Sequence, residues 1–240
     1  MKKGFTLSEV LITLGIIGIV AVLTVPAVMK NYQNRLYVAQ LRKAYSQIAE
    51  AAQAIMADEH CADFYETKAA AANACSDADK GKCEAGAGYF LNKYFKSVNK
   101  DCNNLSEGKT VGDLCVAVGS NKKPTDADSY KNLQNGNAGT LNGEYCIETT
   151  NRAALCARYF PTGADGAGKP VFSINLDINS ATQPNTTGRD VFWVDILPNG
   201  LVVDHRPQGR DNPVDPALCG KPNSTGCVQK IINDGWKMTY

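Results

Sequence analysis

The stretch that decides the fold is the start of the chain, Met1-Lys2-Lys3-Gly4-Phe5-Thr6-Leu7-Ser8-Glu9, followed by an apolar run from Val10 to Met29. A secretory signal also begins with positive charge and an apolar run. Its small-residue cleavage site follows that run, so the run is discarded. Here the small residue, Gly4, precedes the run, and a carboxylate, Glu9, stands at its leading edge. This order does not fit a secretory signal.

The segment from Gly4 to Glu9, placed before an apolar helix, resembles the processing site of type IV pilins and type II secretion pseudopilins. The resemblance implies cleavage between Gly4 and Phe5 and N-methylation of Phe5, which makes Glu9 the fifth residue of the mature chain. Pro26 lies where many members of this family kink the same helix. The implied partners are a prepilin peptidase/methyltransferase, other pilin or pseudopilin subunits and an inner-membrane assembly platform.

Glu9 needs a physical explanation of its own, because an ionised side chain inside a membrane-spanning helix costs about 2.5–3.5 kcal/mol and usually has a partner. Cleavage after Gly4 creates a positive amine on Phe5, four residues away. In an assembling filament, Glu9 of one subunit can pair with the Phe5 amine of a neighbour. The alternative is that Glu9 lies at headgroup depth and is solvated there.

The composition restricts the classes of function. The chain has 240 residues, with 25 basic and 24 acidic side chains. This near-neutral balance gives no global field for nucleic-acid binding, although a local patch such as Lys93, Lys96 and Lys100 stays open. Nucleophile-elbow, phosphate-loop and zinc-protease motifs do not occur in the sequence. We therefore expect a structural protein and not an enzyme.

Nine cysteines all follow residue 60, which indicates that this part of the chain folds in an oxidising compartment. The zinc interpretation is poor, since the sequence has no Cys-x-x-Cys pair and only two histidines. Short spacing favours a Cys219–Cys227 bridge, and similar C-terminal disulfide loops occur in pilins. Cys146 with Cys156 and Cys102 with Cys115 are further candidates. The odd count leaves one thiol over, among Cys61, Cys75 and Cys83.

The first 58 residues are expected to contain one long helix. Val10–Met29 would span about 30 Å as a helix, which matches the hydrocarbon core of a membrane. After Lys30 the apolar residues recur at spacings of three and four, which predicts one buried stripe on an otherwise polar helix. The stripe consists of Val38, Leu41, Tyr45, Ile48, Ala52 and Ile55. Pro26 is expected to bend or locally melt the helix.

The remainder is expected to form a disulfide-stapled head built on an antiparallel sheet, so the fold class is α+β and, by the resemblance, pilin-like. A short helix is expected at Tyr89–Val98, a long loop at Asp126–Gly143 and a hairpin turn at Pro198-Asn199-Gly200. Strands are expected at Leu114–Val118, Glu144–Thr149, Leu155–Phe160, Pro170–Leu176, Val191–Ile196 and Leu201–Asp204, with a last strand or tail at Trp236–Tyr240. The expected segments are a leader at 1–4, a membrane or filament-core helix at 5–29, its amphipathic continuation at 30–58 and the head at 59–240.

One cofactor, calcium, is a candidate. Asp177, Asn179 and Asp190 offer the oxygen ligands that calcium prefers, and some pseudopilins bind calcium in a C-terminal loop. The segment lacks the glycine and terminal glutamate of an EF-hand loop. Loops rich in Asp, Asn and Gly are also ordinary turn chemistry, which is the simpler explanation of these residues.

Three functional hypotheses follow. The first is a subunit of a type IV pilus-like filament, either a major or a minor pilin. Before assembly it would be anchored by a single span in the bacterial inner membrane. The second is a pseudopilin of a type II secretion system, which shares the same N-terminal signal. The third is a filament-displayed adhesin or DNA-binding module.

Overall fold

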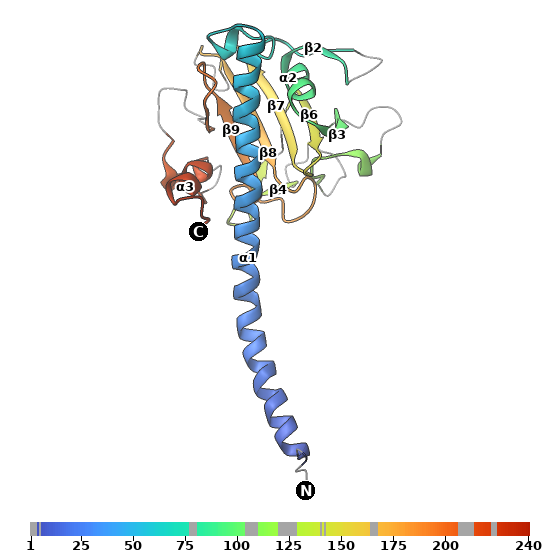
Figure 1. Ribbon diagram of the computed structural model, residues 1–240, viewed down its shortest axis with the longest axis vertical. Coiled ribbons are helices and arrows are strands. Elements are labelled where there is room, and N and C mark those ends of the chain that lie inside the picture. The colour runs from blue at the N-terminus through green and yellow to red at the C-terminus, as the bar shows by residue number, and fades with distance from the viewer. Residues whose placement is uncertain are drawn as a thin grey trace.

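The computed structural model shows a long helix that carries a globular head at its C-terminal end (Figure 1). The structure describes residues 4, 6–76, 81–103, 110–119, 129–139, 141, 143–163, 168–205, 214–221 and 225–240. Phe5 lies outside the described residues.

Helix α1 runs without interruption from Leu7 to Asp58. Figure 1 shows that its N-terminal half projects beyond the head and curves gently, while the helix stays continuous through Pro26. Pro26 therefore does not melt the helix. The helix is long and apolar enough to cross a membrane, and the apolar part is not covered by any other part of the described chain.

The second half of α1 packs on the head through the predicted stripe. Leu41, Ile48, Ala52 and Ile55 are completely buried, Val38 is nearly so, and Tyr45 is half-buried. The prediction of an amphipathic continuation is confirmed. The change from an exposed apolar helix to a one-sided stripe marks the point where the helix meets the sheet.

The head is built on one six-stranded antiparallel sheet with the strand order β10-β9-β8-β7-β6-β3. Consecutive strands from β6 to β10 are neighbours, as expected for a meander. The six strands are β3 (Ser97–Lys100), β6 (Tyr145–Thr149), β7 (Ala154–Phe160), β8 (Val171–Asp177), β9 (Val191–Ile196) and β10 (Val202–Asp204). Two small two-stranded sheets flank it, formed by β1 (Ala74–Cys75) with β2 (Cys83–Ala85) and by β4 (Tyr130–Lys131) with β5 (Asn137–Gly139).

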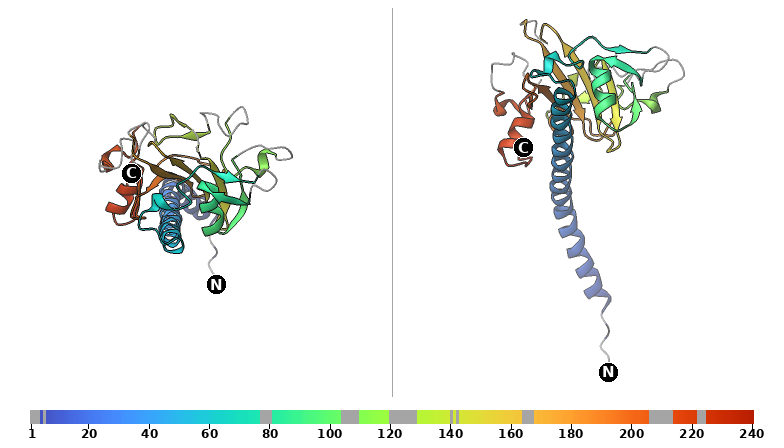
Figure 2. Two further views of the ribbon diagram at one scale, coloured as in Figure 1. Left: turned by 90° about the horizontal axis from the view of Figure 1, so that it is seen from above. Right: turned by 45° about the horizontal axis from the view of Figure 1, so that its top comes forward.

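The two faces of the sheet are covered differently. On β8, Phe172, Ile174 and Leu176 are fully buried in a core that they share with α1, α2 (Gly86–Tyr94) and α3 (Cys227–Asn233). Figure 2 shows α1 and α2 on the same side of the sheet and α3 beside α1. Alternate residues such as Ser173 and Asp177 point to the opposite face, where buried polar groups collect. The α+β fold class is confirmed.

The β9–β10 hairpin turns where the sequence predicts. Gly200 has φ of +74°, the left-handed region that a glycine tolerates without strain. The turn docks on α1, because Gln53 Nε2 donates to the Asn199 carbonyl at 3.1 Å.

Three local expectations for the head were wrong. Leu114–Val118 is not a strand, because Cys115 N–H donates to the Cys102 carbonyl and Ala117 N–H donates to the Tyr130 hydroxyl instead of to a ladder. The helix expected at Tyr89–Val98 is instead α2, Gly86–Tyr94, and Ser97 and Val98 belong to β3. The long loop expected at Asp126–Gly143 contains β4 and β5.

Helix α3 was not expected at all. The carboxylate of Asp204, at the end of β10, accepts hydrogen bonds from Gly226 N–H at 3.1 Å and Gln229 N–H at 2.8 Å. It therefore caps the first turn of α3 from a distant strand. Short 3₁₀ turns at Phe64–Glu66, Val111–Asp113 and Pro216–Leu218 complete the described elements.

Candidate functional site

The start of α1 is a capping box that holds Glu9. The Thr6 backbone N–H and the Thr6 hydroxyl each donate to Glu9 Oε2 at 2.8 Å, and Glu9 N–H donates to Thr6 Oγ1 at 3.3 Å. The pattern Thr-x-x-Glu is a sequence signature of a helix start. Thr6 is therefore a functional residue that the sequence argument missed, although this signature was present.

The other polar side chains of the apolar half bond to their own helix. Thr13 Oγ1 donates to the Glu9 carbonyl at 2.9 Å, and Thr24 Oγ1 donates to the Val20 carbonyl at 2.9 Å. Hydroxyls satisfied in this way are tolerated inside a membrane. Glu9 is the only ionisable side chain between Leu7 and Met29, so it is the one group of the span whose charge needs a partner.

Gly15 and Gly18 lie in the exposed part of α1. A methyl group added at either position would meet no atom within 4 Å. Large apolar side chains around them are exposed as well, for example Leu14 at 60% and Ile19 at 66%. The isolated chain thus leaves this whole surface for lipid or for other helices.

Residues 1–25 match the family model of the prokaryotic N-terminal methylation motif. The chain carries the prepilin-type signal of type IV pilins and pseudopilins. No curated protein and no solved structure matches the chain. The family match ends at residue 25, so it describes the signal and most of the apolar run but not the head.

The prepilin-type signal indicates how the start of the chain is processed and what the exposed helix contacts. It implies processing by a prepilin peptidase and assembly with other pilin subunits. The fold agrees with it, since a long apolar N-terminal helix whose second half packs on an antiparallel sheet is pilin-like. The signal and the apolar helix together indicate a chain with a pilin-type N-terminus that is long enough to anchor it in a membrane.

Four disulfides connect cysteines of the head. The structure brings together the three pairs that spacing favoured, Cys102–Cys115, Cys146–Cys156 and Cys219–Cys227, and adds Cys75–Cys83. Cys61 is the free thiol. Cys146–Cys156 joins facing positions of β6 and β7, whereas Cys219–Cys227 fixes the first residue of α3.

The calcium candidates meet on the polar face of the sheet. Asp177 and Asp190 are completely buried, and Tyr130 lies over them with its hydroxyl 3.4 Å from Asp177 Oδ2. Burial and the negative charge of Asp190 raise the pKa of Asp177 well above its usual value, and burial also raises the pKa of Asp190. The two buried carboxyl groups are thus close enough for the charge of one to raise the pKa of the other.

Three oxygens on the connection between β8 and β9 are buried and have no hydrogen-bond partner within the described part of the chain: Asn179 Oδ1, Asn185 Oδ1 and Thr187 Oγ1. Orphaned buried acceptors are rare and need an explanation. Carboxylate and amide oxygens in this number match the ligands that calcium takes. Asn185 and Thr187 thus supply the same kinds of oxygen as the residues that the sequence suggested, while Asp190 already accepts hydrogen bonds from the Asn185 N–H at 2.8 Å and the Thr186 N–H at 2.6 Å.

His205 belongs to a different buried cluster. Its Nδ1 lies 2.9 Å from Asp195 Oδ1, and the Ser173 hydroxyl donates to the same oxygen at 2.6 Å. Burial alone would lower the pKa of His205, but the hydrogen bond to Asp195 and the charges of Asp195 and Asp204 outweigh it and raise this pKa. Ser173 bonds the carboxylate and not the imidazole, so this trio is not arranged as a nucleophile with its base.

The three lysines considered for nucleic-acid contact do not share a helical face. Lys93 lies on α2, where it forms an ion pair with Asp58 at 3.4 Å and lies 5.0 Å from the Tyr94 ring centroid. Lys96 follows the end of the helix, and Lys100 ends β3. These lysines do not lie along one helix because α2 ends at Tyr94.

Proposed function

We propose that this chain is a structural subunit of a type IV pilus-like filament. One observation carries the proposal: the prepilin-type signal leads into a helix whose N-terminal half is apolar, exposed and free of the head. A surface of this size is stable only in lipid or against other apolar helices. A prepilin peptidase/methyltransferase cuts between Gly4 and Phe5 and methylates Phe5, and the subunit then moves from the membrane into a bundle of such helices.

Assembly is the mechanism. In the membrane, Glu9 is held by its own capping box with Thr6. In the filament, the carboxylate of Glu9 accepts the Phe5 amine of a neighbouring subunit, so that both charges leave lipid as a pair. The α1 stripe and the disulfides keep the head folded outside the cytoplasm during this transfer.

Filament formation is tested in cells that contain a pilus assembly system. We expect immunogold electron microscopy to detect the head in filaments sheared from the cell surface. In Gly4→Val, we expect the chain to be made in the same amount as wild type but to stay unprocessed in the inner membrane. A chain that stays a membrane monomer after processing contradicts the filament role. Filaments confined to the periplasm, with secretion lost in their absence, indicate the pseudopilin alternative.

We also propose that the head holds one calcium ion between β8 and β9, with oxygens from Asp177, Asn179, Asn185, Thr187 and Asp190 as candidate ligands. The support is that Asp190 acts electrostatically on the buried Asp177, and that three oxygens of the same β8–β9 connection are buried without a hydrogen-bond partner among the described residues. A bound divalent cation would neutralise the pair and fix the β8–β9 connection. Calorimetric titration of the full chain with calcium tests this, and Asp177→Asn is expected to abolish the binding.

A further inference from the structure

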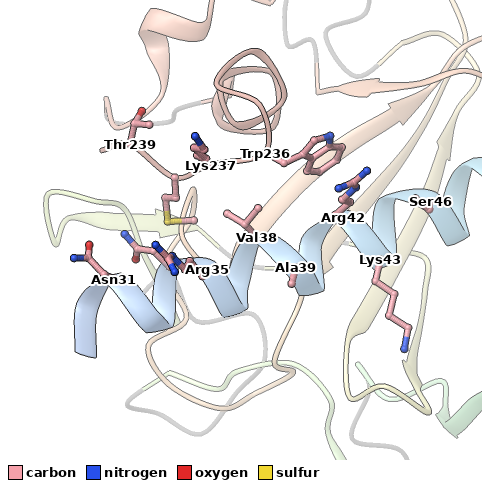
Figure 3. A pocket seen from close by; sticks show the side chains of 12 residues that line it. Asn31, Arg35, Val38, Ala39, Arg42, Lys43, Ser46, Trp236, Lys237 and Thr239 are labelled. Atoms are coloured by element: carbon pink, nitrogen blue, oxygen red, sulfur yellow. The ribbon is translucent and has the colours of Figure 1, made fainter. Parts of the chain in front are cut away.

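A groove of about 730 Å³ runs between α1 and the C-terminal tail (Figure 3). It begins at Asn31, two residues after Met29, where the apolar run ends. The tail that forms one wall is anchored at two points. Trp236 packs edge-on to Tyr45 with ring centroids 5.7 Å apart, and the Tyr240 hydroxyl donates to the Gly188 carbonyl. Because the tail is held at both of these contacts, the wall of the groove that it forms is fixed in position.

The charges that line the groove are all positive. They belong to Arg35, Arg42 and Lys43 on α1 and to Lys237 on the tail. Two of the cations have contacts of their own: Arg42 lies 5.4 Å from the Trp236 ring centroid, and Lys43 Nζ donates to Asn151 Oδ1 at 2.7 Å. Arg35 and Lys237 are exposed and have no carboxylate partner among the described residues.

The groove opens where the membrane surface should lie. Arg35 is six residues after Met29, the end of the apolar run, which places its Cα about 9 Å beyond the hydrocarbon core. Polar headgroups occupy about 5–8 Å on each side of that core. Long side chains on a helix lean toward its N-terminus, so the Arg35 guanidinium can reach back into this layer.

We propose that the end of the groove formed by Arg35, Lys237 and Asn31 binds the phosphate of an anionic phospholipid while the subunit waits in the membrane. The surface between the groove and the hydrocarbon core fits the rest of such a lipid, since Val28 and Tyr32, which precede Arg35 on the helix, are exposed at 65% and 64%. Acyl chains contact these apolar residues while the headgroup phosphate meets the cations. Free phosphate or an acidic peptide would contact only the cations and would leave the exposed apolar residues without a partner. The inference rests on the proposed membrane stage of a filament subunit.

The test uses the full chain, purified in detergent and mixed with equal amounts of phosphatidylglycerol and phosphatidylcholine, with the retained lipid counted by native mass spectrometry. Wild-type chain is expected to retain phosphatidylglycerol selectively. Neutralising one juxtamembrane cation weakens anionic lipid binding about fivefold, so the double variant Arg35→Gln/Lys237→Gln should lose about 30-fold. The matched control Lys100→Gln/Lys169→Gln removes the same charge from the head elsewhere and should retain the lipid.

Each outcome has a distinct meaning. Equal retention of the two lipids by wild type, or equal loss in the test and control variants, overturns the lipid site. Unchanged lipid selectivity together with lost filaments in Arg35→Gln/Lys237→Gln also overturns it and assigns the groove to a subunit contact. Alkaline extraction separates this result from failure of the proposed function, because a chain that leaves the membrane at high pH was never inserted.

Discussion

Replacing Glu9 by Gln and Thr6 by Ala separates the two roles that the start of α1 combines. Gln keeps an oxygen that can accept the Thr6 hydrogen bonds at the same position, but it removes the charge. Ala removes the hydroxyl that donates to Glu9 at 2.8 Å and accepts from Glu9 N–H at 3.3 Å, but it leaves the carboxylate charged. If charge neutralisation drives assembly, only Glu9→Gln should prevent it.

The expected sizes differ enough to be measured. In Glu9→Gln the amine on Phe5 of the neighbour stays unpaired in the filament core, at a cost of about 2.5–3.5 kcal/mol, which lowers subunit addition roughly 60- to 300-fold. Loss of a helix cap costs about 1 kcal/mol, so Thr6→Ala should lower it about fivefold at most.

Quantitative immunoblotting of sheared filaments, divided by the processed subunit left in the membrane, measures this ratio. Intact mass of the membrane pool serves as the control, because both variants must be cleaved and methylated like wild type before they are compared. Wild-type assembly by Glu9→Gln, or an equal loss in Thr6→Ala, would refute the proposed charge pairing.

Three further perturbations test other parts of the structure. A Cβ added at Gly15 meets no atom of the head or of other side chains within 4 Å, so in Gly15→Ile the insertion and the thermal unfolding of the head should match wild type while filaments are lost. Val22→Ile, at a residue 73% exposed, is the control. Calcium at about 100 times its dissociation constant should raise the unfolding temperature of the head by about 5–10 °C. This gain should shrink as the pH falls through the raised pKa values of Asp177 and Asp190, and Asp177→Asn should show none of it. The pKa of His205 is raised by folding, so its contribution is complete below its unfolded pKa near 6.5 and is lost as the pH rises through the folded pKa; urea unfolding should show this decline in wild type and not in His205→Gln.

What the sequence predicted well depends on local patterns. The helix stripe, the β9–β10 turn and strands β6 to β10 follow from periodicity and turn chemistry close along the chain. Helix α3 could not be predicted in this way, because it has seven residues and takes its cap from Asp204, 22 positions before Gly226.

The candidate sites divide in the same manner. The signal from Gly4 to Glu9 is one continuous segment and can be recognised directly. The pattern Thr6-x-x-Glu9 inside it also predicts the helix cap. The contact of Asn185 N–H with the Asp190 carboxylate forms within the β8–β9 connection, whose path no periodic pattern indicates. The groove likewise depends on the last residues of the chain returning to α1, which no local pattern indicates.

The central claim is that the chain is matured as a prepilin, and intact mass spectrometry of the protein from its native membrane tests it most directly. The account predicts a chain that lacks Met1 to Gly4, begins at Phe5 and carries one added methyl group. A chain that retains residues 1–4, or one that is cut after the apolar run and so has lost Val10–Met29, would contradict it.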